Sequence, residues 1–183
     1  RAVAKGVRRT SSKFGARLEP FSHVDVQLHL GRNLDTITQA ESITNYGRLV
    51  AADYQLYTAA TVLLETADKL TEVEREPAVA QHLLLVGALH ALATGRHAAS
   101  LVLDSYLLRA LAVAGWAPSF FDCARCGAQG PHRSFNPSAG GSVCDVCRPP
   151  GSASPDPATI ELLGALLSGD WAAAEATEPR QRS

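Results

Sequence analysis

The chain has 183 residues, 46% of them hydrophobic, which is enough to bury a core in one or two small domains. No apolar run reaches the length of a membrane span, so we expect a soluble cytoplasmic protein. The net charge of −1 hides an asymmetry, because residues 1–32 hold seven Lys and Arg against two acidic residues, giving +5 there and −6 in the remainder. This segregation predicts an anionic partner for the N-terminal part, nucleic acid before membrane surface, with a solvated basic face as the alternative.

The first forty or so residues are patterned as β structure. From Val24 to Leu30 apolar and polar residues alternate, which is the period of a strand with one face in a core. A turn signal at residues 31–33 precedes a β-branched stretch over 34–38, so a hairpin is predicted, and residues 1–4 are a further candidate strand. Three strands are too few to close a barrel, so we expect support from the helical region or, as we favour, further strands in a complete protein.

A basic loop over residues 5–17 lies between the first two candidate strands. Its five cations alternate with small hydroxyl residues and glycines. Arg and Lys bind phosphate oxygens, and hydroxyls and backbone amides add hydrogen bonds. Because nothing here resembles a base-reading helix, we expect nucleic-acid binding that is sensitive to salt and tolerant of sequence. Phe14 either anchors the loop to the core, which we favour, or stacks on a base.

From about Ile43 the hydrophobic period becomes helical. Apolar residues at three- and four-residue steps predict a helix that ends near Leu70, before a charged stretch and Pro77. Two more helices are predicted over 79–94 and 97–114.

Turn and cap residues mark the ends of the later elements. Gly115 is expected to end a helix in the left-handed conformation, and residues 148–152 are expected to be a linker. Asp156 and the proline after it predict the start of a short helix that runs to Ser168. The polar residues 175–183 are expected to fray.

The four cysteines of the chain form two CxxC pairs with seventeen residues between them: Cys123, Cys126, Cys144 and Cys147. Each pair is a tight turn that aims two thiolates at one point, and two such turns supply the four ligands of a tetrahedral Zn²⁺. Gly127 suits the positive φ expected just past a second ligand. Because the four thiolates leave no open position on the metal, we expect one structural zinc ion without a catalytic role.

Two other roles for the cysteines are less favoured. Disulfides belong to exported proteins, and the chain begins with a basic segment in place of an apolar leader. A thioredoxin-like redox pair would require a CxxC that opens a helix after a strand, and neither pair has that context.

The remaining polar residues give no catalytic constellation. The six histidines lack HExxH spacing. His132, which lies between the two cysteine pairs, could replace a cysteine as a metal ligand, but four thiolates already complete the coordination shell. No P-loop, GxSxG, GxGxxG or paired-carboxylate motif is present. We therefore do not expect an enzyme.

Several of these residues resemble one known family when they are taken in order. They are Lys5–Arg9, Ser12–Gly15, Leu18–Phe21, Leu34–Glu41, Leu107–Leu111, Gly115–Pro118 and Cys123–Gly127. Together they resemble the bacterial DNA repair protein RecO, and the resemblance covers nearly the whole chain.

The resemblance implies an α+β fold. An N-terminal OB-fold-like β domain, incomplete in this chain, would span residues 1–42, and a helical domain over 43–183 would carry the zinc site at 123–147 as an inserted four-cysteine knuckle. An OB-fold presents one face and its loops to nucleic acid, which agrees with a basic, loop-rich β segment. The family's OB-fold has strands before the point that matches Arg1, and the family usually continues past the point that matches Ser183, so we expect this chain to be part of a longer protein.

The resemblance also implies a function in DNA repair and recombination. Members bind single- and double-stranded DNA, anneal complementary strands, and work with RecR to help RecA displace single-strand-binding protein in the bacterial cytoplasm, at the nucleoid. The four cysteines match the family's zinc ligands one for one. The residues that would contact DNA are Lys5, Arg8, Arg9, Lys13, Arg17 and Arg32.

Two functions from other classes remain as alternatives. A zinc-ribbon module that binds RNA or a protein would lack annealing activity and would prefer those partners to single-stranded DNA. A zinc hydrolase would require an open metal position beside a carboxylate or histidine, so a metal bound by four sulfurs would exclude it.

Overall fold

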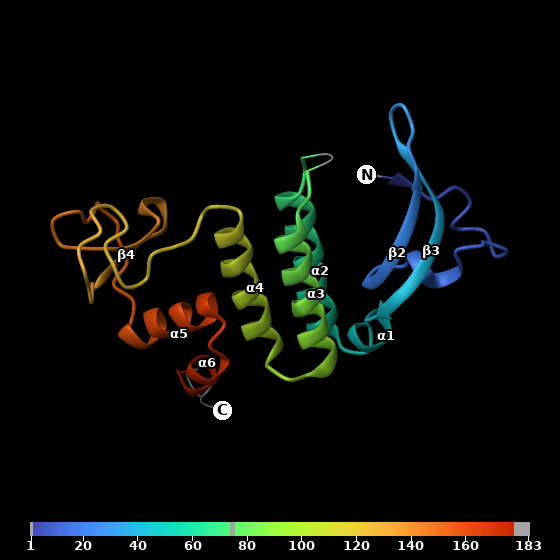
Figure 1. The fold of residues 1–183 in the computed structure, drawn as a ribbon. Coiled ribbons are helices and arrows are strands. Elements are labelled where there is room, and N and C mark those ends of the chain that lie inside the picture. The colour runs from blue at the N-terminus through green and yellow to red at the C-terminus, as the bar shows by residue number, and fades with distance from the viewer. Residues whose placement is uncertain (1, 74–75, 178–183) are drawn as a thin grey trace. The chain divides into compact units, whose positions relative to one another are not determined.

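The computed structural model describes residues 2–73 and 76–177, and the fold is α+β as expected. The chain forms two compact units, residues 1–99 and 100–183, each described here by itself. Strands and the first three helices make up the first unit, and the cysteine segment lies in the second (Figure 1).

The sheet of the first unit has the strand order β1-β3-β2. The predicted hairpin is confirmed: β2 (Ser22–His29) pairs antiparallel with β3 (Asp35–Asn45). The short strand β1 (Ala2–Val3) pairs parallel with the start of β3. The β3 strand is longer than the pattern predicted, because the helical period assigned from Ile43 begins while the chain is still extended.

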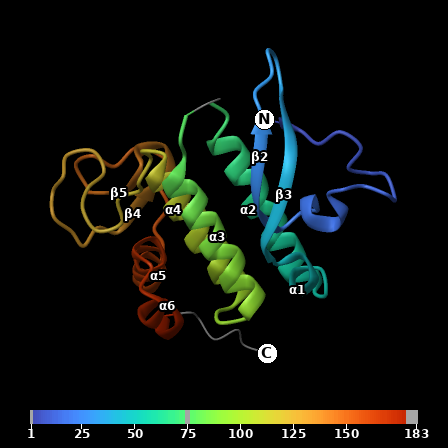
Figure 2. The ribbon, with the colours of Figure 1, turned by 45° about the vertical axis from the view of Figure 1, so that its right-hand side comes forward.

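Within the stretch of β3 that pairs with β2, two residues have no partner. The pairing skips Thr38, between the pairs Leu28–Ile37 and Gln27–Gln39, and skips Ile43 nearer the end of the strand. Each is a β-bulge, which disrupts the ladder locally and increases the twist of the strand. Figure 2 shows the long, twisted hairpin that results.

Three helices complete the first unit. They are α1 (Gly47–Val50), α2 (Tyr54–Leu70) and α3 (Val79–Thr94), the last two antiparallel and side by side (Figures 1 and 2). Asp53 caps α2 by accepting hydrogen bonds from the backbone N–H groups of Gln55 and Leu56. The cap starts the helix well after the predicted position.

Aromatic contacts join the strands of the first unit to its helices. The ring of Phe21, at the start of β2, meets Tyr57 of α2 edge to face, with centroids 5.6 Å apart. Tyr46, just past β3, is buried and lies 6.3 Å from the ring of His90 on α3. Such pairs add to the stability that apolar burial gives the interface between sheet and helices.

The second unit combines three helices with a small hairpin. The helices are α4 (Ala99–Val113), α5 (Pro157–Ser168) and α6 (Trp171–Thr177). Between α4 and α5 lie β4 (Ser134–Asn136), the 3-10 turn Pro137–Ala139 and β5 (Gly141–Val143). The small hairpin was not predicted, and neither was α6. The expectation that the tail frays from residue 175 was wrong for residues 175–177, which are helical in α6, and residues 178–183 lie outside the described residues.

Cap residues behave in the second unit as the sequence predicted. Gly115 has φ +91° past the end of α4, and Asp156 Oδ1 accepts a hydrogen bond from the N–H of Ala158 at the start of α5. The core contains Leu101, Leu166 and Ala174, and a buried hydrogen bond from Ser105 Oγ to the carbonyl oxygen of Leu166 ties α4 to α5.

Candidate metal centre and nucleic-acid interface

The four cysteines meet at one point in the second unit. Their Sγ atoms all lie within 4.8 Å of one another, and those of Cys126 and Cys144 are 3.8 Å apart. Cys123 is buried, whereas Cys126 is exposed. Four thiol sulfurs gathered within a few ångströms are a donor set that could hold a metal ion.

Local backbone structure aims the sulfurs at that point. Gly127 has the expected positive φ, +72°, which lets its N–H return to the carbonyl oxygen of Cys123 and close the first CxxC turn. The second turn closes through the N–H of Cys147 and the carbonyl oxygen of Cys144.

The unpredicted hairpin holds the two turns together. The N–H of Ala124 donates to the carbonyl oxygen of Ser142 on β5, and the hydroxyl of Ser142, which is buried, donates to the carbonyl oxygen of Phe120. The N–H of Ser119 donates to the carbonyl oxygen of Gly140, just before β5, and the N–H of Ser142 on β5 donates to the carbonyl oxygen of Ser119. The site therefore rests on a small folded framework.

The thiols of the cluster differ in acidity. The N–H of Cys144 points at the sulfur of Cys123 from 3.4 Å, and this bond, with backbone donors at Cys126 and Arg125, lowers the pKa of Cys123 to about 6. Hydrogen bonding with the sulfurs of Cys126 and Cys144 raises the pKa of Cys147 to about 12. Backbone N–H donors that favour a thiolate suit a site for a cation, because the anionic sulfur is the metal ligand.

The basic loop of the first unit is a chain of tight turns. Backbone hydrogen bonds link Val7 to Ala4, Arg9 to Gly6 and Ser12 to Arg9, and the 3-10 turn Gly15–Leu18 follows. Phe14 is only 2% exposed, which confirms that it anchors the loop and leaves no ring face for a base.

The candidate DNA-binding residues are all exposed. Five of them lie on this loop, whereas Arg32 lies apart from them in the turn between β2 and β3 (Figure 1). Two of the five bind the protein itself. The ammonium group of Lys13 donates to the carbonyl oxygen of Thr38 at 2.8 Å, and Arg17 Nη1 donates to the carbonyl oxygen of Lys13 at 3.0 Å.

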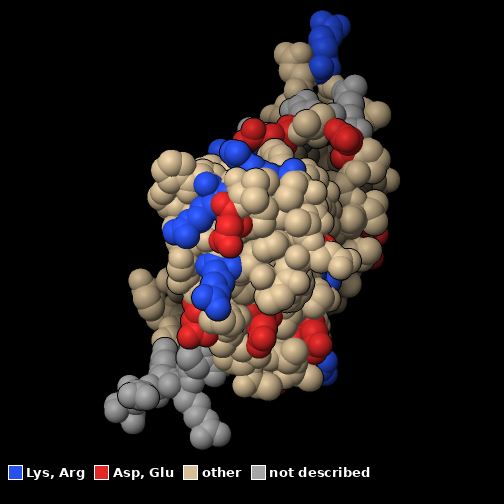
Figure 3. All heavy atoms as spheres, turned by 90° about the vertical axis from the view of Figure 1, so that its left-hand side faces the viewer, with Lys and Arg blue, Asp and Glu red and all other residues tan. Residues whose placement is uncertain are grey.

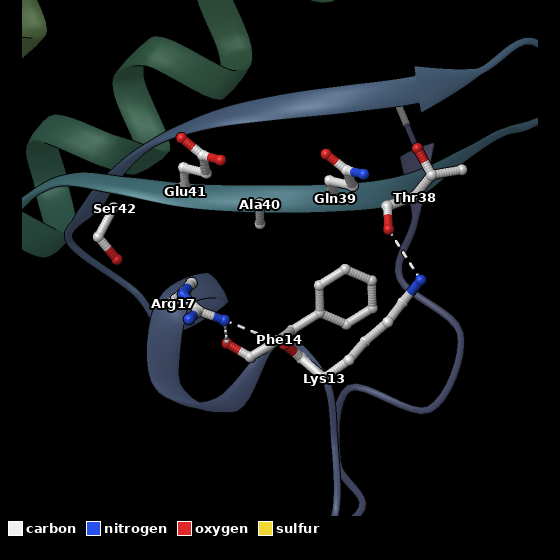
Figure 4. Close-up of a pocket in the computed structure, with 8 residues that line it drawn as sticks. All are labelled: Lys13, Phe14, Arg17, Thr38, Gln39, Ala40, Glu41 and Ser42. Carbon is white, nitrogen blue, oxygen red and sulfur yellow. Dashed lines mark hydrogen bonds between the residues drawn. The ribbon is translucent and has the colours of Figure 1, made fainter.

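Open hollows separate the loop from β3 on either side of these contacts. One, of about 500 Å³, lies between Lys13, Phe14, Arg17 and the strand, and the other, of about 510 Å³, extends toward Asn45. Ala40 points from β3 toward the Phe14 ring, whereas Gln39 and Glu41 point to the other face of the strand (Figure 4). Of the candidate DNA-binding residues, Lys13 and Arg17 therefore border recessed surface.

Charges of both signs are mixed on one face of the structure. Figure 3 views the side on which β4 lies in Figure 1, and there Lys and Arg are interspersed with Asp and Glu among uncharged residues. Surfaces of mixed sign do not concentrate a polyanion as a basic loop does.

Comparison with known proteins assigns both parts of the chain. A family model described as recombination protein O, C-terminal, matches residues 51–182, and its N-terminal counterpart matches residues 1–46. The chain belongs to the RecO family. Its expected fold class, an α+β chain with an OB-fold-like N-terminal region and a helical region that holds the four-cysteine cluster, is confirmed.

Individual RecO proteins match over nearly all of the chain. The chain is 64% identical over 183 residues to the DNA repair protein RecO of Nocardioides sp. (strain ATCC BAA-499 / JS614), covering 98% of this chain and 75% of that protein. Identity to the DNA repair protein RecO of Streptomyces coelicolor is 61% over 186 residues, with the same coverages. For that of Thermobifida fusca it is 56% over 183 residues, covering 100% of this chain and 75% of the relative.

Membership identifies a DNA repair protein, as the resemblance implied. Within the described ranges, no helix has the length and apolarity to cross a membrane.

The role of Thr38 could not be foreseen from the residue pattern. Its contribution is a backbone carbonyl oxygen exposed by a bulge, and a carbonyl group carries no residue-type signal. The hairpin beside the cysteines did leave a signal in the adjacent glycines Gly140 and Gly141, which mark a tight turn.

Proposed function

We propose that this RecO-family chain is a recombination mediator that binds single- and double-stranded DNA and anneals complementary strands. The supporting observation is the basic loop, whose exposed cations are carried on a segment anchored by a buried phenylalanine. Annealing requires two strands with their charge neutralised and their bases free to pair, and a basic surface that does not read sequence provides this.

The DNA surface in this proposal consists of six exposed cations of the N-terminal region. We propose that this region spans residues 1–42; in the structure its last strand, β3, continues to Asn45. They are Lys5, Arg8, Arg9, Lys13, Arg17 and Arg32. Single-strand affinity should fall with salt at a log–log slope of roughly −0.7 for each phosphate neutralised.

The helical region, proposed to span residues 43–183, would hold one structural Zn²⁺ on Cys123, Cys126, Cys144 and Cys147. Four soft sulfur donors close together favour zinc among the common cellular metals. When bound, the ion would link the two CxxC turns; with four protein ligands it has no position for water, so we propose no enzymatic activity.

The mediator acts, in this proposal, with RecR, helping RecA displace single-strand-binding protein from single-stranded DNA. A function on chromosomal DNA also puts the chain in the bacterial cytoplasm, at the nucleoid.

The test is annealing of two complementary oligonucleotides by the parent chain and by Lys5→Ala/Arg8→Ala/Arg9→Ala. Annealing should be strong for the parent and reduced about tenfold or more in this variant, because roughly three phosphate contacts are lost. The matched control is Arg125→Ala/Arg133→Ala/Arg148→Ala, which removes three exposed cations of the cysteine segment.

Two results would overturn the proposal. One is equal loss of annealing in both triple variants, which would reflect net charge alone. The other is a folded, metal-loaded parent that prefers RNA and does not anneal DNA, which would favour an RNA-binding zinc module.

A further inference from the structure

Lys13 is joined to the sheet at an irregular point. Thr38 is skipped in the pairing of β3 with β2, so its backbone lies outside the regular ladder. The Thr38 hydroxyl donates to the carbonyl oxygen of Gln27 at 3.0 Å, and the Thr38 carbonyl oxygen accepts from Lys13 Nζ at 2.8 Å (Figure 4). A bond from an ammonium group to a carbonyl is stronger than one between neutral groups.

The bond is one of the contacts that hold the loop on the sheet, together with the buried Phe14 and the 3-10 turn Gly15–Leu18, which lies against β2 and β3. The Phe14 ring is buried on the side of β3 to which Ala40 points, and the Lys13 ammonium lies 5.1 Å from the centroid of that ring (Figure 4). Open hollows of about 500 and 510 Å³ adjoin these contacts, so the Lys13 side chain crosses partly unfilled space between the loop and β3. Phe14 thus anchors the loop by apolar burial, and Lys13, its neighbour in the chain, anchors it by a hydrogen bond.

The three cations nearest the start of the loop are in a different situation. Lys5, Arg8 and Arg9 are exposed, and they make no side-chain hydrogen bond or ion pair with any residue that the structure describes. The Arg9 side chain lies over Gly6, where an added Cβ would come 3.6 Å from Arg9 Cδ. Their placement follows from the backbone turns of the loop and from its attachment at residues 13 and 14.

We propose that Lys13 is a positioning residue for DNA binding: its bond to the bulge at Thr38 holds the loop on the sheet and so directs Lys5, Arg8 and Arg9 toward the nucleic acid. The inference rests on the proposed function, and it assigns different roles to the cations of the proposed DNA surface. Lys13 acts through the loop, whereas the three cations before it neutralise phosphates.

The first test needs no DNA. An arginine-specific protease cleaves after Arg8 and Arg9 only when the loop opens, and the rate reports the population of the open form. Lys13→Met should be cut about fivefold faster than the parent, as loss of an exposed charged hydrogen bond predicts. Lys13→Arg should restore protection at Arg8 and Arg9, with the cuts located by mass spectrometry because this variant adds an arginine site to the loop. Lys5→Met, which removes a lysine without a partner, should leave the rate at these two sites unchanged. Equal rates for Lys13→Met and the parent would overturn the proposal.

The second test is a double-mutant cycle on binding to an oligo-dT strand, followed by fluorescence anisotropy at several salt concentrations. Lys13→Met and Arg8→Ala/Arg9→Ala are compared with the variant that combines them. If Lys13 positions the arginines, the double arginine variant loses several-fold less affinity in the Lys13→Met background than in the parent, because the losses are coupled. Lys13→Arg should bind as the parent does.

Additive losses, with Lys13→Met lowering the salt slope by roughly 0.7, would make Lys13 an independent phosphate contact and overturn the inference. A parent that does not bind DNA at all would overturn the proposed function instead, while the protease comparison still decides whether Lys13 holds the loop.

Discussion

Phe14 and Lys13 are neighbours in the chain, yet only one of them could be understood from the sequence. A lone aromatic residue among cations and glycines favours an anchor, because a large apolar side chain is stabilised by burial, and the structure buries Phe14. The partner of Lys13 is a backbone carbonyl oxygen at a bulge. Its identity depends on strand register, which residue types do not encode locally.

Replacing Phe14 tests the anchor. Phe14→Ala should lower the free energy of unfolding by about 3 kcal/mol, at the lower end for a buried aromatic because open hollows adjoin the site. Tyr54→Ala, at a residue 81% exposed in the same unit, should change it by less than about 0.5 kcal/mol. Urea denaturation measures both, and equal effects would show that Phe14 is not part of the core.

The acidity of the cysteines predicts how metal binding depends on pH. Because the pKa of Cys123 is lowered to about 6, the contribution from its thiolate is present at neutral pH and is lost as the pH falls through 6. Cys147, with a pKa raised to about 12, must lose a proton when the metal binds. Zinc affinity should therefore fall from pH 8 to 6 and more steeply below 6.

Competition with a chromophoric chelator at each pH measures this dependence. Circular dichroism of the same samples separates proton competition from unfolding. An affinity that is flat between pH 8 and 6 would mean that sulfur is not the principal donor.

At the scale of elements, those with clear end signals were predicted, whereas α6 and the β4–β5 hairpin were not. The α3 helix has the predicted bounds, because Pro77 before it and Gly95 after it, at φ +60°, mark the two ends of a largely apolar run. The β4–β5 hairpin has three residues in each strand, too few for a period to appear, and it forms because Ser119 and Phe120 supply partners from elsewhere.

Gly141 tests the importance of that hairpin. It has φ +143°, and an added Cβ would fall on the carbonyl oxygen of Ser119, so Gly141→Ala should cost about 3 kcal/mol of stability. Gly127→Ala is the matched control, since its φ is also positive but open space surrounds it, and a cost of about 1 kcal/mol is expected. Thermal unfolding of the two variants should rank them in this order, and the reverse order would contradict the packing of Gly141 on Ser119.

For the whole molecule, the change in hydrophobic period along the sequence marks where strands give way to helices. The grouping of these elements into compact units depends instead on which of their surfaces pack together. The helices α2 and α3 belong with the sheet because ring contacts bridge them: Phe21–Tyr57, Tyr46–His90 and His23–His82. Contacts between residues so far apart in the chain leave no periodic trace. The cysteine cluster was predicted because tight spacing and ligand chemistry act locally within each pair.

Loss of the metal should be felt in one unit, because each unit has its own buried core. Cys144→Ser should lower the zinc content and speed hydrogen exchange about tenfold or more across residues 119–153, while β2, β3 and α2 exchange at the parent rate. Val146→Ser, at the 94% exposed tip of the second CxxC turn, is the control that should keep metal and protection. Unchanged metal content in Cys144→Ser would refute the four-sulfur site.

The two bulges of β3 also constrain how this hairpin can change in length. Eight residues of β2 pair with eight of β3, and the pairing skips Thr38 and Ile43. Side chains alternate between the two faces of a strand, so each skipped residue shifts this alternation by one position relative to β2, and the second shift cancels the first. Losing one of them would put one end of the strand on the wrong face, whereas losing both would keep both ends in phase. Insertions and deletions in β3 should therefore be tolerated in even numbers.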